Sequence, residues 1–114
     1  VLASPTRAHD LAEALIAETT GDGLRLEGFL ILLRSSGNPR AVAICREQIE
    51  RHQQRRLAST VDASDAAERA AVALSLIAGF QFMRQMVGLG ALDASSPDRL
   101  AAVLTPALAA LLDA

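Results

Sequence analysis

Two long apolar segments occupy the C-terminal half of the chain, and both have helical spacing. Residues 65–89 are apolar on nearly every side of a helix, whereas residues 96–114 carry their apolar side chains on one stripe. A helix that is apolar on every side needs cover on every side. A chain of 114 residues has few helices to supply that cover. The pattern therefore predicts that a second molecule covers one face of the 65–89 segment.

Three further helices are predicted upstream, and no strand pattern is present. Ser4, Asn38 and Ser96 are each followed by proline, which pairs a good N-cap with the residue preferred at the first helical position. The five predicted helices span about residues 4–19, 23–35, 38–59, 65–89 and 96–114. The sequence thus predicts an all-α domain, a helical bundle of about five helices, in a single unit covering residues 1–114.

The 100° step of an α-helix divides the 65–89 segment into two apolar faces. We expect one face to pack on the chain's own helices and the other on a second copy, so that the last two helices form a four-helix dimer interface. Gly79 lies in the middle of the helix and indicates a close approach by another helix, within the chain or across the dimer. The candidate interface residues are Val72, Leu76, Gly79, Met83, Leu100, Leu104, Ala107, Leu108 and Leu111.

The order and spacing of several short strings resemble the C-terminal end of TetR-family transcriptional regulators. These strings are Leu76 to Arg84 (LIAGFQFMR), Gly88 to Leu92 (GLGAL), Ser95 to Leu100 (SSPDRL) and Leu104 to Leu108 (LTPAL). Upstream, residues 30–34 and 38–41 are similar to the mid-domain helix pair of the same family, so the resemblance runs from about Leu24 onward. It implies a cytoplasmic repressor's ligand-binding and dimerisation domain. No segment resembles the family's helix-turn-helix, so we expect DNA contact only through a domain absent from this chain.

The resemblance also implies a pocket for a small-molecule effector among the second, third and fourth helices. The effector is expected to be apolar or weakly acidic. Core packing is the alternative role for each candidate residue, and Arg84 beside an apolar face needs a partner in either case: an acidic ligand, a carboxylate of the chain or solvent at a helix end. The candidate ligand-binding residues are Phe29, Leu33, Ile49, Ile77, Phe80, Gln81 and Arg84.

Charge and reactive side chains argue against several other functions. The net charge is −2, the pI is about 5.6 and the basic run from Arg46 to Arg56 is diluted by two glutamates, so no nucleic-acid surface is predicted. Cys45 and His52 would lie about 10 Å apart along one helix, too far for a nucleophile and its base. His9 and Glu13 supply only two metal ligands. We expect no enzyme activity, no metal and no cofactor.

The uncharged stretch from Ala70 to Met83 is shorter than the roughly 20 residues that a membrane span requires. A buried helix of a protein without membrane contact is the preferred interpretation, and the chain, which begins at Val1, is expected to be a piece of a longer protein. One alternative remains open: a stand-alone helical dimer that binds a hydrophobic metabolite or a partner helix and has no role on DNA.

Overall fold

The computed structural model describes residues 7–19, 31, 34 and 36–113, and these residues form helices joined by short turns. The predicted all-α fold is confirmed for this part of the chain, which contains no strand. The predicted helix at about residues 23–35 lies almost wholly outside the described residues. The elements are α1 (Arg7–Glu18), α3 (Pro39–Gln48), η1 (Ile49–Gln54), α4 (Arg55–Ala58), α5 (Ala66–Gln81), η2 (Phe82–Val87), α6 (Gly90–Asp93) and α7 (Pro97–Leu112).

Two side-chain caps fix where α3 and α7 begin. The Asn38 side chain accepts hydrogen bonds from the amides of Arg40 and Ala41, and Ser96 accepts one from the amide of Arg99. Each cap satisfies amides that have no partner inside the first turn of the helix. The predicted starts of the third and fifth helices are therefore confirmed, whereas the single turn α6 was not predicted.

Two of the predicted helices are continuous rods that contain a π-helical turn. The first joins α3, η1 and α4 without a break, and the second joins α5 to η2. The second rod ends at Gly88, whose φ of 69° is left-handed and whose amide donates to the carbonyl of Met83. Glycine adopts this conformation without steric cost and so ends the rod.

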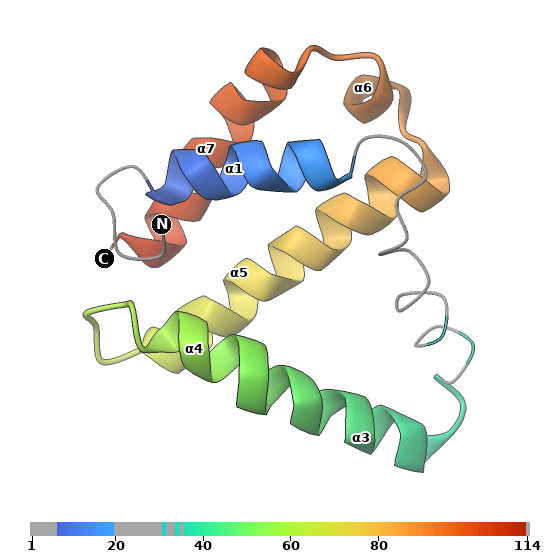
Figure 1. Ribbon diagram of the computed structural model, residues 1–114, viewed down its shortest axis with the longest axis vertical. Helices are drawn as coiled ribbons and strands as arrows, with labels where there is room; N and C mark the ends of the chain where they lie inside the picture. The colour runs from blue at the N-terminus through green and yellow to red at the C-terminus, as the bar shows by residue number, and fades with distance from the viewer. Residues whose placement is uncertain (1–6, 20–30, 32–33, 35, 114) are drawn as a thin grey trace.

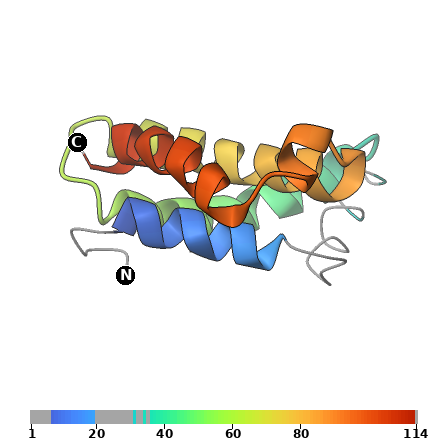
Figure 2. The same ribbon diagram turned by 90° about the horizontal axis from the view of Figure 1, so that it is seen from above.

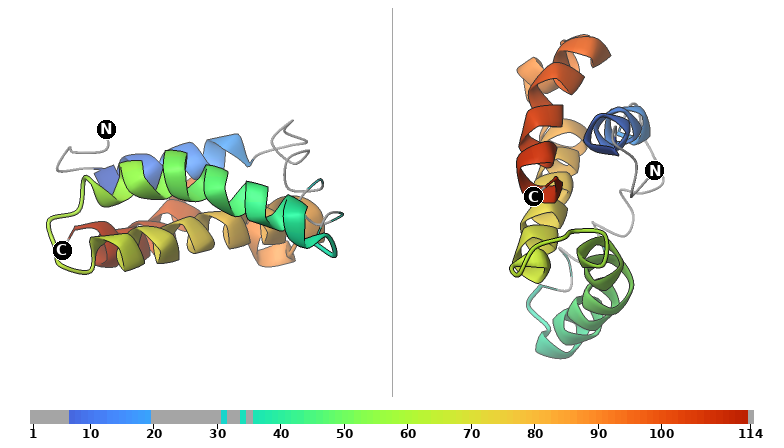
Figure 3. Two further views of the ribbon diagram at one scale, coloured as in Figure 1. Left: turned by 90° about the horizontal axis from the view of Figure 1, so that it is seen from below. Right: turned by 90° about the vertical axis from the view of Figure 1, so that its left-hand side faces the viewer.

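The helices form two layers. Figure 1 shows α5 running diagonally between the α1–α7 pair and the α3–α4 rod, and Figure 2 places α5 and α7 in one layer with α1 and the α3–α4 rod in the other. The views in Figure 3 agree with this arrangement. The molecule measures 39 × 38 × 17 Å. Its shortest dimension, 17 Å, is the thickness of the two helical layers together. Each layer is therefore covered by the other layer on one side only, and its outer side is left to solvent or a partner.

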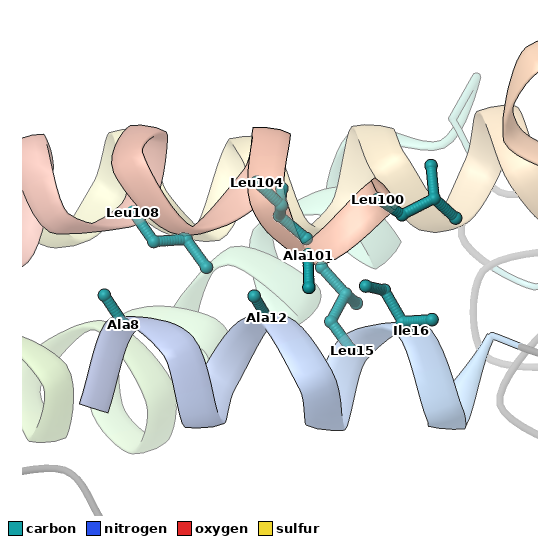
Figure 4. Close-up of a cluster of buried hydrophobic side chains, with 8 residues drawn as sticks. All are labelled: Ala8, Ala12, Leu15, Ile16, Leu100, Ala101, Leu104 and Leu108. Atoms are coloured by element: carbon teal, nitrogen blue, oxygen red, sulfur yellow. The ribbon is translucent and has the colours of Figure 1, made fainter. Parts of the chain in front are cut away.

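The larger buried cluster joins α1 to α7. In Figure 4, four side chains of α1 and four of α7 point toward one another, with alanines opposite leucines so that the two helices approach closely. The cluster consists of Ala8, Ala12, Leu15, Ile16, Leu100, Ala101, Leu104 and Leu108. A second, smaller cluster joins the end of α7 to α4 and α5 through Leu57, Val61, Ala70, Ala73 and Leu112.

This packing corrects part of the predicted dimer interface. Leu100, Leu104 and Leu108 were expected to face a second copy, but they are buried against α1 of the same chain. The helical spacing of α7 identified a buried stripe without identifying its partner. The sequence predicted the helix that forms α1 but did not pair it with α7, and its short stripe of alanine, leucine and isoleucine supplies the covering surface.

Candidate functional site

A groove of about 440 Å³ runs between α1, the η1–α4 part of the rod and α5. A volume of this size lies within the range of small-molecule pockets in proteins. Four aliphatic side chains form its apolar part, and three polar ones come from η1 and α4. The lining residues are Leu11, His52, Gln53, Arg56, Leu57, Leu74 and Ile77. The groove can accommodate a molecule with an apolar body and a polar end.

The polar side of this groove depends on helical spacing. His52 and Arg56 are four residues apart on one rod, so they lie on the same side of it and both line the groove. These side chains are exposed, and the helical spacing alone does not reveal which neighbour lies alongside them. His52, Gln53 and Arg56 are thus groove residues that the sequence interpretation missed.

The predicted ligand-binding residues do not gather in one place. Ile77 lines the groove and also packs, with Phe80, against the α1–α7 cluster. Ile49 lines a separate groove of about 350 Å³ between the rod and α5, which shares only Leu74 with the first. Gln81 is half-buried near the end of α5. Phe29 and Leu33 lie outside the described residues.

Arg84 has a partner within the chain. Its Nη1 donates to the carbonyl of Ile16 at 2.7 Å and to Oγ1 of Thr19 at 3.0 Å. These acceptors lie at the C-terminal end of α1, where helix carbonyls lack partners and the helix dipole favours a cation. The sequence offered three partners for Arg84: an acidic ligand, a carboxylate of the chain or solvent at a helix end. The structure provides a helix end, but the acceptors are protein atoms of α1 rather than solvent. Arg84 therefore holds α1 to η2.

The outer side of α5 and η2 is open. Val72 is 52% exposed and Met83 is 41% exposed, and an added Cβ at Gly79 would meet nothing within 4 Å. No helix of the described chain approaches Gly79. Leu76 and Leu111 are half-buried, whereas Ala107 is exposed on α7. Of the two faces predicted for this helix, the one containing Ala73, Ile77 and Phe80 packs inside the chain and the one containing Val72, Gly79 and Met83 does not.

Residues 66–87 also form a helix long and apolar enough to cross a membrane by length and composition. Such a helix is weak evidence for a membrane span, because core helices pass the same test. Glu68, Arg69 and Arg84 lie within it. Arg84 is used to bind the end of α1, as described above, which ties this segment into the helical domain.

The remaining reactive side chains form no cluster in the described part of the chain. His9 Nε2 lies 3.0 Å from Glu13 Oε1 on the exposed side of α1, and Cys45 is a half-buried free thiol on α3. Among the described residues, no group of three His, Cys, Asp or Glu side chains is arranged to hold a metal ion. Glu47 and Arg51 form an exposed ion pair at 2.7 Å.

The fold and the grooves define a small, two-layered, all-helical domain with an interhelical groove and an open apolar face. A family model described as the Tetracyclin repressor-like, C-terminal domain matches residues 6–112, nearly the whole chain. The chain belongs to this family, and the resemblance found in the sequence is confirmed. No curated protein and no solved structure matches the chain.

Proposed function

We propose that this chain is the small-molecule-sensing and dimerisation domain of a TetR-family transcriptional repressor. Its DNA binding is assigned to a helix-turn-helix domain outside residues 1–114, and its location to the cytoplasm. Family membership supports the regulatory role. The observation that carries the sensing role is the groove between α1, η1–α4 and α5, which combines aliphatic walls with a polar end.

The open side of the α5–α7 layer supports a homodimer. Val72, Gly79 and Met83 are exposed on α5 and η2, and Val103 and Ala107 are exposed on α7. Arg69 Nη1 donates to the carbonyl of Ala110 at 2.9 Å, so the two helices lie side by side and their exposed residues belong to one layer. A second copy is the occupant that we propose, because the open space above Gly79 allows the same helix of a symmetry mate to approach closely.

Dimerisation and sensing are linked in this proposal by α5. One side of the helix lines the groove through Leu74 and Ile77, and the opposite side carries the proposed interface. An effector that binds one arrangement of the helices more tightly than another shifts the population toward it. The relative position of the two copies, and of any DNA-binding domains joined to them, then changes with effector concentration.

The dimer is tested by paired substitutions. Val72→Arg places a charge at the proposed interface, and Ile44→Arg places the same charge on α3, where the wild-type side chain is equally exposed at 55%. We expect the wild type and Ile44→Arg to sediment as dimers at tens of micromolar and Val72→Arg to sediment as a folded monomer. A monomeric wild type at this concentration contradicts the proposal, as does a dimer that Val72→Arg leaves intact.

The sensing role is tested by filling the groove. Ile77→Trp occupies part of its volume, and Ile44→Trp places the same side chain on an exposed site of α3 that is 55% accessible. Compounds that raise the melting temperature of the wild type should lose that effect in Ile77→Trp and keep it in Ile44→Trp, because binding stabilises only the native state. If both variants lose the ligand-induced rise in melting temperature equally, or if neither loses it, the groove is not the effector site.

A further inference from the structure

The charge of the groove between α1, η1–α4 and α5 is one-sided. His52 and Arg56 line it, and none of its lining residues is acidic. Other hollows of the molecule differ. The hollow of about 470 Å³ between α1 and the start of α7 is lined by Glu13 and Asp98, and the groove between α3–η1 and α5 has both Arg46 and Glu50. A cationic end is thus a property of this groove in particular.

The two basic side chains of the groove differ from other arginines in the described part of the chain. Arg51, on the same rod, is paired with Glu47, Arg69 is paired with Asp65, and Arg7 is paired with Asp113. In the described part of the chain, the side chains of His52 and Arg56 form no ion pair and no hydrogen bond. Arg56 presents five N–H donors that an incoming anion can use.

The rest of the groove is a hydrocarbon surface. Leu57 is buried, and Leu11, Leu74 and Ile77 are half-buried, so a bound chain or ring would complete the cover of all four side chains. His52 and Arg56 are close together on one wall of the groove. A bound molecule can therefore reach both of them with a single polar group. The groove therefore matches a molecule with one anionic group and an apolar tail.

We propose that the effector is an amphipathic carboxylate, with its carboxylate bound by Arg56 and His52 and its tail lying along Leu11, Leu74 and Ile77. The guanidinium of arginine pairs with a carboxylate through two parallel hydrogen bonds, which gives orientation as well as affinity. Gln53 supplies a neutral donor on the same wall. This inference rests on the proposed sensing function and adds the chemical class of the ligand.

The test compares octanoate with 1-octanol, which has the same tail and no charge, by titration calorimetry on the full chain. Arg56→Gln removes the proposed contact, and Arg55→Gln removes the same charge from the neighbouring residue, which lines a different hollow. Octanoate should bind the wild type and Arg55→Gln alike, and Arg56→Gln about tenfold or more weakly, as expected for loss of a hydrogen bond to a charged group. Arg56 is exposed, so circular dichroism should confirm a folded variant.

The remaining outcomes separate this inference from the sensing function. If octanol binds as tightly as octanoate, or if Arg55→Gln and Arg56→Gln weaken octanoate equally, the carboxylate assignment is wrong. In that case, loss of octanol binding in Ile77→Trp still supports a sensing groove. If neither compound binds the wild type at millimolar concentration, the carboxylate assignment and the groove's sensing role are both contradicted.

Discussion

Arg7 and Asp113 are 106 positions apart and form an ion pair, with 3.1 Å between Nε and Oδ1. The pair joins the first residue of α1 to the residue that follows α7. The guanidinium also donates to the carbonyl of Leu112 and to the carbonyl and hydroxyl of Thr60. One buried cation therefore satisfies the end of α7 and the turn between α4 and α5.

Replacing Arg7 with Met should lower the free energy of unfolding by about 3 kcal/mol, because buried carbonyls lose their donor while the apolar stem is kept. Urea unfolding measures the change. Asp113→Asn is the comparison: the Asp113 side chain is 41% exposed, so that change should cost less than about 1 kcal/mol. Equal losses in the two variants would show that the ion pair, rather than the carbonyls, is the main contribution of Arg7.

Leu108→Ala should lower the free energy of unfolding by about 2–5 kcal/mol, because Leu108 is fully buried between α1 and α7 and its loss leaves a cavity. Ile44→Ala, at an exposed site of α3 outside the proposed interface, should change the free energy of unfolding by no more than about 0.5 kcal/mol. Both are measured by urea unfolding. A small loss for Leu108→Ala would contradict the burial of this stripe inside one chain.

Arg84→Met should lower the free energy of unfolding by about 1–2 kcal/mol, because the carbonyl of Ile16 and the hydroxyl of Thr19 lose their donor. It should leave octanoate affinity unchanged, whereas Arg56→Gln should show the opposite pattern. Arg40→Met, at an exposed site, controls for the loss of one positive charge. Loss of octanoate binding in Arg84→Met would show that Arg84 contributes to ligand binding as well as to the packing of α1.

Asp65 should make stability depend on pH on the acid side. Its hydrogen bond from Arg69, at 2.8 Å, and the charge of Arg69 hold the pKa of this carboxyl below its ordinary value of 3.8. A lowered folded-state pKa contributes stability above the unfolded pKa, and that contribution is lost as pH falls below about 4. We expect Asp65→Asn to have a lower urea midpoint than the wild type at pH 6 and the same midpoint near pH 2. A difference that persists at the lower pH would point to a cause other than ionisation.

The helix starts could be predicted because capping is local: Asn38 and Ser96 each bond to amides within three residues. The helix that packs on each apolar stripe could not be predicted, because helical spacing identifies an apolar stripe without identifying what covers it. Leu104 and Leu108 illustrate this limit, since the stripe was correct and the covering helix was α1 rather than a second copy. The pocket was predicted among the second, third and fourth helices, and Ile77 lines the groove, but the contribution of α1 through Leu11 was not predicted for the same reason.

Arg84 illustrates a different limit. Its position beside an apolar face correctly indicated that it needs a partner, but backbone carbonyls carry no sequence signature. The end of α1 becomes a candidate only when α1 and η2 are placed side by side. His52 and Arg56 resemble an ordinary solvated pair until Leu11 and Ile77 are placed opposite them.

The packing of α1 on α7 also determines the order in which this domain can fold. Residues 7–18 must meet residues 97–112 before the main cluster closes, so its contacts bridge nearly the full length of the chain. Closing so long a loop costs conformational entropy before any contact repays it, which slows folding relative to bundles whose neighbours in sequence pair first. Until α7 has been synthesised, the apolar stripe of α1 lacks its main partner. The newly made chain therefore exposes part of the Leu15 and Ile16 surface to chaperones, or to other unfinished chains, until residues 97–112 have been made.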